Sequence, residues 1–222
     1  VNSYEVINQA NLVIDNASKI DDATERATVE GEALFLRAMT YFDMVRFYGG
    51  VPLRTAGVTN YGADLDIERA SADAIYAQVA SDLNDAYIKL PASNGEFADK
   101  YAAKALLARV HLQLGNYAEA LTAANDVLAN SGHSLASSFA RAFNNDSDSS
   151  EDIFAFQVTS QDGSNALVTH YAAMVFGGRG GDIVVDTYRS LFDSALDVRR
   201  GFFYISPDSG AICTYKYTNE YG

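Results

Sequence analysis

An aromatic-rich apolar pattern that ends in two glycines is the feature that most constrains the fold of this chain. Residues 30–53 are EGEALFLRAMTYFDMVRFYGGVPL, with apolar side chains at steps of three and four. This period predicts a helix, because residues three and four apart lie on the same helical face. The predicted apolar face consists of Leu34, Ala38, Tyr41, Val45 and Tyr48. The polar positions between them are Arg37, Asp43 and Arg46.

The end of this helix is equally well marked. Gly49 and Gly50 contribute no packing and leave the backbone free to turn, and Pro52 prevents the helix from continuing. We interpret the aromatic side chains of the segment as core packing, namely Phe35, Tyr41, Phe42, Phe47 and Tyr48. The segment is therefore predicted to be an amphipathic helix followed by a sharp turn.

Four further segments carry the same helical period. They span residues 2–18, 71–90, 99–114 and 118–130, and the helix described above covers about 24–48. Residues 21–24 and Ser71 offer side chains that can cap the helices that follow them. A loop rich in Thr, Gly and Asn separates the second helix from the third. The first 130 residues are thus predicted to form a helical scaffold.

Residues 105–128 resemble a tetratricopeptide repeat, a pair of closely packed antiparallel helices. Gly115 permits the reversal between them, and Tyr117 is predicted to fill the gap beneath the turn. The small residues that allow close approach are Ala105, Ala108, Ala120 and Ala124. The helices at 24–48 and 71–90 resemble a second such pair with a long loop inserted between them.

The sequence changes character at about residue 131, where Gly, Ser, Asn and Asp become frequent and apolar runs shorten. Residues 153–158 and 211–217 are predicted as short strands, 186–196 as a short helix, and 167–176 as either. The predicted fold class is mostly α, with tetratricopeptide-like helix pairs, a loop-rich face and a few short strands. We predict one domain, with 1–130 as scaffold and 131–222 as the ligand-binding face, because binding sites tend to lie on loops.

The charge of the chain limits its partners. It has 29 acidic and 16 basic residues among 222, a net charge of −13. Nucleic-acid binders meet phosphates with clustered Lys and Arg, which this sequence lacks, so nucleic acid is not an expected partner. Neutral sugars remain compatible. The single cysteine, Cys213, cannot form an intramolecular disulfide or a multi-cysteine metal site, and no cofactor is expected.

An acidic loop at residues 144–152 resembles the start of a calcium-binding loop, because Asp146 and Asp148 alternate there. The pattern then fails. Glu151 falls where an EF-hand requires Gly, and Gln157 falls where it requires a bidentate Glu. We interpret the loop as a solvated turn and predict no metal site.

A glycine-rich segment, FGGRGGD, occupies residues 176–182. Glycines next to an arginine could hold a phosphate, but the segment matches neither the P-loop nor the GxGxxG pattern. We interpret it as a loop that is shaped by glycines and presents Arg179 and Asp182.

Catalytic signatures are missing from the sequence. His111, His133 and His170 have no HExxH, GxSxG or Cys–His pattern around them. The many carboxylates leave open a pair suited to glycoside hydrolysis. The chain is predicted not to be an enzyme, and a glycoside hydrolase is kept as a less favoured alternative.

The pattern Glu-x-x-x-x-Arg-Ala-x-x-Tyr-Phe-x-x-Val-Arg-x-Tyr-Gly-Gly-Val-Pro-Leu in residues 32–53 resembles the signature helix of the SusD/RagB family. Residues 4–14, 107–128, 151–158 and the loop at Arg179 resemble other family segments, in the same order. The resemblance implies a surface lipoprotein of Bacteroidetes that captures nutrients, usually glycans, for a SusC-like TonB-dependent transporter in the outer membrane. Complete members are longer and begin with a lipid-anchor cysteine. The chain is therefore expected to be a central fragment without that anchor.

Tyr side chains near loops are the candidates for sugar contact, because they stack on sugar rings and hydrogen-bond to hydroxyls. We predict ligand contacts from Tyr61, Tyr171, Phe176, Arg179 and Asp182. Starch-binding members of the family use Trp and Tyr, so the lack of Trp argues against a starch-type site here. The sequence leaves open a tetratricopeptide scaffold that binds a peptide or protein.

Overall fold

The computed structural model divides into two compact units, residues 1–132 and 133–222. It describes residues 3–60, 62, 66–142, 149–156, 166–171, 174, 177–179, 190–192, 194, 196–207 and 209–214. The assignment of residues 1–130 to a scaffold and 131–222 to a ligand-binding face within one domain stays a prediction.

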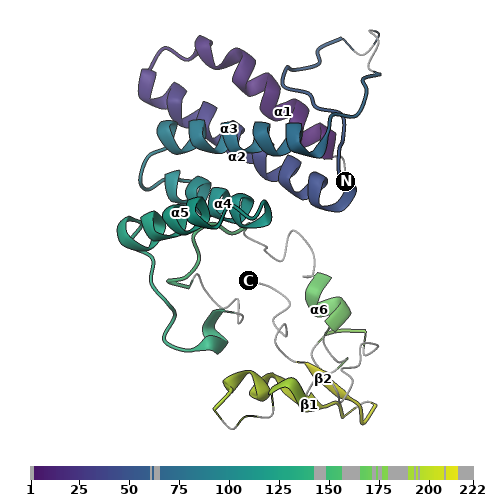
Figure 1. Ribbon diagram of the computed structural model, residues 1–222. Helices are drawn as coiled ribbons and strands as arrows, with labels where there is room; N and C mark the ends of the chain where they lie inside the picture. Colours follow the sequence, from purple (N-terminus) through teal and green to yellow (C-terminus); the bar gives the residue numbers. More distant parts are fainter. Residues whose placement is uncertain are drawn as a thin grey trace. The chain divides into compact units, whose positions relative to one another are not determined.

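The first unit is a stack of helices (Figure 1). The helices are α1 (Ser3–Asn16), α2 (Ala23–Tyr48), α3 (Ala72–Lys89), α4 (Lys100–Gln113) and α5 (Tyr117–Asn130). Each helix packs against the next one along the chain. All five predicted helices are therefore confirmed at nearly the predicted bounds. The pairs α2–α3 and α4–α5 are consistent with tetratricopeptide-like units.

Side-chain caps explain where three of these helices begin. Asp22 accepts hydrogen bonds from the N–H groups of Thr24 and Glu25, both at 2.8 Å. The Ser71 hydroxyl accepts from the N–H of Ala74 at 3.2 Å. Asp99 caps α4 in the same way. These bonds satisfy N–H groups that have no partner within the helix, so the predicted caps before α2 and α3 are confirmed.

The core of this unit follows the predicted period until the last turn of α2. Leu34, Ala38, Tyr41 and Val45 are buried, as are Phe35 and Phe42. Phe47 and Tyr48 are 75% and 67% exposed, so their prediction as core residues is wrong. The helical period continues to the end of α2, but burial needs more than a helical face: the centroids of these two rings lie 6.3 Å from each other, and both rings remain largely exposed.

The turn between α4 and α5 depends on Gly115, whose φ of 77° lies in the left-handed region that favours glycine. Tyr117 does not fill a gap beneath this turn, since 70% of it is exposed. It is the first residue of α5 and lies in line with the exposed Leu121 and Leu128, beside the stripe that contains the buried Ala120 and Ala123.

The described residues of the second unit form little regular structure. Their elements are the 3-10 helices η2 (Phe139–Ala142), η4 (Ser190–Phe192) and η5 (Val198–Phe202), helix α6 (Ala166–Tyr171), and strands β1 (Phe203–Ile205) and β2 (Ile212–Thr214). The strands form an antiparallel hairpin in which Ile205 pairs with Ile212. No helix in the described ranges is long and apolar enough to cross a membrane.

The predictions for this unit have mixed outcomes. The strand at 211–217 is confirmed over Ile212–Thr214, and the ambiguous segment 167–176 contains helix α6. Of the short helix predicted at 186–196, only the 3-10 turn η4 is described. The strand at 153–158 is wrong over 153–156, which is irregular. Strand-forming residues need a paired neighbour, and here the rings of Phe154 and Phe156 pack edge-to-face at 5.2 Å instead.

Candidate functional site

A polar row on α1 holds the loop that joins α2 to α3. The row consists of Tyr4, Asn8, Asn11 and Asp15, whose spacing places them along one helical face. Asn8 makes the most complete contact, because its Oδ1 accepts from the Val58 N–H at 2.7 Å and its Nδ2 donates to the Val58 carbonyl at 3.3 Å. The Asn8 amide thus bonds to both backbone groups of one loop residue, as a neighbouring strand would.

The other members of this row bond to the same loop. They connect Tyr4 to the Pro52 carbonyl at 2.8 Å, Asn11 to the Arg54 carbonyl at 3.2 Å, and Asp15 to the Gly57 N–H at 2.7 Å. The loop passes so close to α1 at Gly57 that a Cβ there would lie 2.6 Å from the Leu12 side chain. Sequence reasoning missed this row, although its spacing of four, three and four is visible in the sequence.

Arg37, one of the predicted polar positions of α2, is buried. Its Nε donates to Asp82 Oδ2 at 2.8 Å, and its Nη2 donates to Asp82 Oδ1 at 2.7 Å. Its Nη1 donates to Asn11 Oδ1 at 2.7 Å. The Gln78 amide also donates to Asp82, at 2.7 Å. Because each charge has several partners, both can lie inside the helical stack.

The Tyr41 hydroxyl of α2 also holds this loop, at Arg54. It accepts from the Arg54 N–H at 2.7 Å and donates to the Arg54 carbonyl at 3.0 Å. Burial raises the pKa of the Tyr41 phenol, and the hydrogen bond from the Arg54 backbone opposes that rise. The phenol is therefore a fixed neutral donor and acceptor.

The base of the loop is closed by Arg69. Its guanidinium donates to the carbonyls of Gly50 and Tyr48 at 2.7 and 2.8 Å, at the C-terminal end of α2 where backbone carbonyls lack helical partners. The Ala70 N–H donates to the Val51 carbonyl at 3.0 Å. A Cβ on Gly50 would lie 2.2 Å from the Ala70 carbonyl oxygen, so this closure requires glycine.

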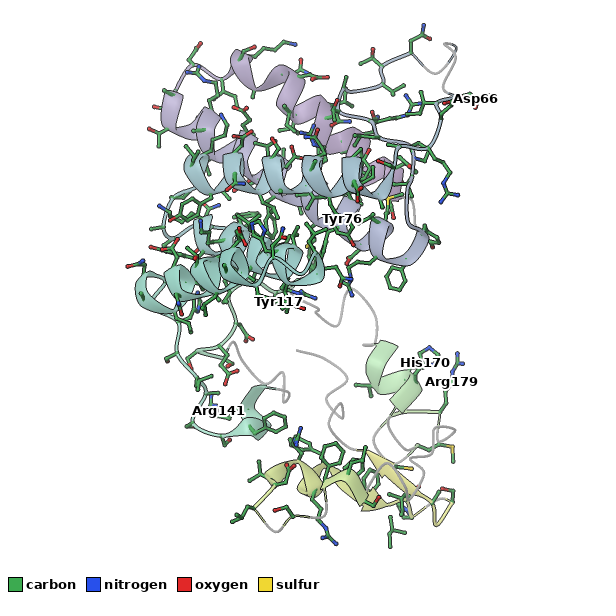
Figure 2. The ribbon with its side chains drawn as sticks, in the orientation of Figure 1. Asp66, Tyr76, Tyr117, Arg141, His170 and Arg179 are labelled. Atoms are coloured by element: carbon green, nitrogen blue, oxygen red, sulfur yellow. The ribbon has the colours of Figure 1, made fainter. Side chains whose placement is uncertain are left out.

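A groove of about 680 Å³ lies between α1 and this loop. Its apolar lining includes Ile7, Pro52, Val58 and Ile67, and its polar lining includes Glu5, Gln9, Arg54 and Asp66. Figure 2 shows Asp66 on the outer part of the loop. The volume lies within the range of about 300–1,000 Å³ that is usual for small-ligand sites.

In the second unit, Arg179 lies beside helix α6. The backbone N–H of Arg179 donates to the Thr169 carbonyl at 3.0 Å. This bond joins the Arg179 segment to helix α6, which ends at Tyr171. Gly177 has a φ of 84°, as expected for a segment shaped by glycines. Figure 2 labels His170 and Arg179 at helix α6 and the segment bonded to it, and both residues are exposed.

Two predicted site residues are thus on adjacent segments, Tyr171 and Arg179. Tyr61, Phe176 and Asp182 lie outside the described residues, and so does the side chain of Tyr171. The role of all five in ligand binding stays a prediction.

The described part of the acidic loop uses its carboxylates within the protein. Glu151 accepts from the Ala136 N–H at 2.7 Å, and Asp152 accepts from the Ser149 N–H at 2.6 Å. No group of three or more metal-ligating side chains comes together among the residues with described positions. Asp146 and Asp148 lie outside them.

The comparisons with known proteins agree on one family. The family model for SusD-like proteins, described as starch-binding and associating with the outer membrane, matches residues 1–112. SusD-like protein P25 of Formosa agariphila is 31% identical over 147 residues, which is 64% of this chain and 28% of P25. SusD-like protein P2 of the same organism is 30% identical over 186 residues, 80% of this chain and 37% of P2.

The fold is also similar to that of SusD-like proteins of known structure. A laminarin-binding SusD-like protein of known structure superposes with a TM-score of 0.83 at 20% identity, over 98% of this chain and 57% of that protein. The chain spans only 28% and 37% of the length of P25 and P2. Because the family model matches residues 1–112 of 222, half of the sequence, the chain belongs to the SusD-like family.

Proposed function

We propose that this chain is part of a cell-surface protein that binds an oligosaccharide and passes it, chemically unchanged, to a TonB-dependent transporter of the outer membrane. The observation that carries the proposal is the family match over residues 1–112, since that family is described as starch-binding and associated with the outer membrane. The structural relative that binds laminarin supports a glycan as the ligand.

The arrangement of the chain suits binding without chemistry. Side chains of α1 and α2 hold the loop after α2 in place, so its surface is formed before a ligand arrives. Aromatic rings supply stacking surfaces for sugar faces, and polar side chains supply hydrogen bonds to sugar hydroxyls. Neither contribution needs a nucleophile or a metal.

The proposed ligand contacts are Tyr61, Tyr171, Phe176, Arg179 and Asp182. The bond between the Arg179 N–H and the Thr169 carbonyl supports grouping Arg179 with Tyr171, because it joins their segments. An exposed guanidinium has five N–H donors, which suits several sugar hydroxyls at once.

Native affinity electrophoresis tests the proposal. The protein is run through gels that contain starch, laminarin or xyloglucan, and we expect one of these glycans to retard it. Arg179→Ala and Tyr171→Ala should reduce the retardation. Arg141→Ala is the matched control, since Arg141 is also an exposed arginine of the second unit. If no glycan retards either this chain or the longer protein that contains it, the proposal is wrong.

The claim that the glycan leaves unchanged needs a separate assay. Incubation of the retarding glycan with the protein should release no new reducing ends. Release that disappears when one carboxylate is replaced by its amide would favour a glycoside hydrolase instead.

An exposed apolar row on α5 favours a second candidate, a helical scaffold that binds a protein segment. The row consists of Tyr117, Leu121 and Leu128. A peptide or protein whose binding is lost in Leu121→Glu, in a chain that no glycan retards, would support this candidate.

A further inference from the structure

We propose that the groove between α1 and the loop after α2 is itself a binding site for a neutral sugar unit, formed entirely by residues of the first unit. This inference rests on the proposed function, because it assumes that the protein meets glycans. It adds a site that the residues around Arg179 do not supply.

The walls of this groove are fixed in advance. Side chains of α1 hold them together through bonds that include those from Tyr4 to Pro52 at 2.8 Å, from Asn11 to Arg54 at 3.2 Å, and between Asn8 and Val58 at 2.7 Å. The side chains that build the walls therefore have their bonds already, and a ligand need not reorganise them. A preformed site avoids much of the entropy cost of ordering loops on binding.

The apolar part of the lining suits the C–H faces of a sugar ring. Pro52 and Val58 are half-buried and Ile67 is exposed, so these three side chains supply the accessible apolar surface, whereas Ile7 is fully buried. The ring of Tyr4 also lines the groove, and its hydroxyl is engaged with Pro52. Because the Tyr4 hydroxyl already has a hydrogen-bond partner, the face of the ring can stack on a sugar.

The polar part of the lining suits sugar hydroxyls. Glu5, Gln9 and Asp66 are exposed, and Arg54 is half-buried. Carboxylate, amide and guanidinium groups are planar and each offers two neighbouring acceptors or donors, which match two adjacent hydroxyls.

The charges of the lining select against other ligands. Two acidic side chains and one basic side chain line the groove, so an anionic phosphate or sulfate meets more repulsion than attraction. No cluster of three metal-ligating side chains occurs within the described ranges, which gives a bare cation no cage there. A neutral polyhydroxyl ligand of one or two sugar rings fits the groove volume of about 680 Å³.

The test is a titration of the ¹⁵N-labelled chain with maltotriose and, separately, with laminaritriose, followed by amide chemical shifts. We expect saturable shifts of the Gly57 and Val58 amides and of the Gln9 side-chain amide with at least one of the two sugars. Gln9→Ala should weaken that binding roughly five- to tenfold, the usual effect of one lost hydrogen bond.

The variant and its control are matched. Gln9 is exposed on α1, and alanine is the better helix former, so Gln9→Ala should leave the unfolding temperature unchanged. Gln113→Ala makes the same change at an exposed position near the end of α4 and should leave sugar binding unchanged. Asp66→Asn provides a second lining variant on the loop side.

The outcomes separate the two proposals. Retardation by a glycan gel together with shifts confined to residues beyond 132 overturns the groove site and leaves the proposed function standing. If the Gln9→Ala and Asp66→Asn variants each bind the sugar with the same affinity as the wild-type chain, the groove site is also overturned. The absence of shifts with either sugar overturns the groove site, and the proposed function fails as well only if no glycan retards this chain or the longer protein that contains it.

Discussion

Arg37 on α2 and Asp82 on α3 form an ion pair through two hydrogen bonds inside the helical stack. Only 5% of the surface of Arg37 and 2% of the surface of Asp82 is exposed. Asn11 of α1 accepts a third bond from Arg37, so three helices meet in one polar network. A buried ion pair is tolerated only when the remaining donors and acceptors are satisfied, as they are here by Asn11 and Gln78.

Removing one partner of this pair should destabilise the protein strongly. Arg37→Met leaves the Asp82 carboxylate buried without its counter-charge, and we expect the free energy of unfolding to fall by about 3–5 kcal/mol. Urea unfolding followed by circular dichroism measures this loss. Arg46→Met is the control, because Arg46 pairs with the exposed Asp43 at 3.4 Å and such pairs contribute at most about 1 kcal/mol. Similar losses in the two variants would contradict the prediction.

Asn8 should control the order of the loop after α2. Asn8→Ala removes two hydrogen bonds to Val58, and we expect faster hydrogen exchange at the Val58 amide and a stability loss of about 1–2 kcal/mol. Asn84→Ala is the control, since the exposed Asn84 side chain donates to the Ala80 carbonyl of its own helix and not to a loop. Unchanged exchange at Val58 in Asn8→Ala would show that other contacts hold the loop.

Gly115 should resist substitution because of its backbone conformation. At a φ of 77°, an alanine Cβ strains the backbone by about 1–2 kcal/mol, although no atom lies within 4 Å of it. Gly115→Ala should therefore lower the unfolding temperature. Gly201→Ala is the control, because Gly201 also has open space around it and does not have a positive φ. Equal effects would mean that the α4–α5 turn adapts without strain.

The bond between Tyr87 and Asp126 should make stability depend on pH. The Tyr87 hydroxyl donates to Asp126 at 2.8 Å, and this bond, followed by one from Asn130, holds the pKa of the Asp126 carboxyl below its ordinary value of 3.8. A carboxyl with a lower pKa in the folded state contributes stability above its unfolded pKa, and that contribution is lost as pH falls through the folded pKa.

The corresponding measurement is urea unfolding of the wild-type chain and Tyr87→Phe at several pH values between about 7 and 2. The variant should be less stable at neutral pH, and its difference from wild type should shrink below about pH 4. Tyr117→Phe, at an exposed tyrosine on α5, should show no such dependence. A difference that stays constant with pH would mean that Asp126 does not titrate against this bond.

The helices of the first unit could be predicted because their signals are local. A cap at Asp22, a cap at Ser71 and the apolar period between them act over a few residues each. The same period identified Arg37 only as a polar position, since a helical pattern cannot show that an aspartate 45 residues later will neutralise it inside the stack. It misplaced Phe47, because the period does not show which turns of a helix a neighbouring element covers.

The candidate site was harder to predict from the sequence than the helices of the first unit. The groove is lined by residues of α1 and of a loop some 50 residues further along the chain, as in the Asn8–Val58 contact. The contacts between them leave no pattern in the loop sequence, because the polar side chains of α1 bond to backbone groups of the loop. Of the five residues that the sequence predicts as ligand contacts, the structure describes two, Tyr171 and Arg179, and a backbone hydrogen bond joins their segments.

The loop after α2 owes its shape to side chains that belong to the helices. Tyr4, Asn8, Asn11 and Asp15 hold it by its main chain, and Tyr41 does the same from α2. Main-chain groups are identical in nearly every residue type, so the side chains of residues 53–56 can be exchanged without loss of these bonds. Substitutions at these loop positions can therefore change the surface of the loop, while side chains of α1 and α2 still determine its path.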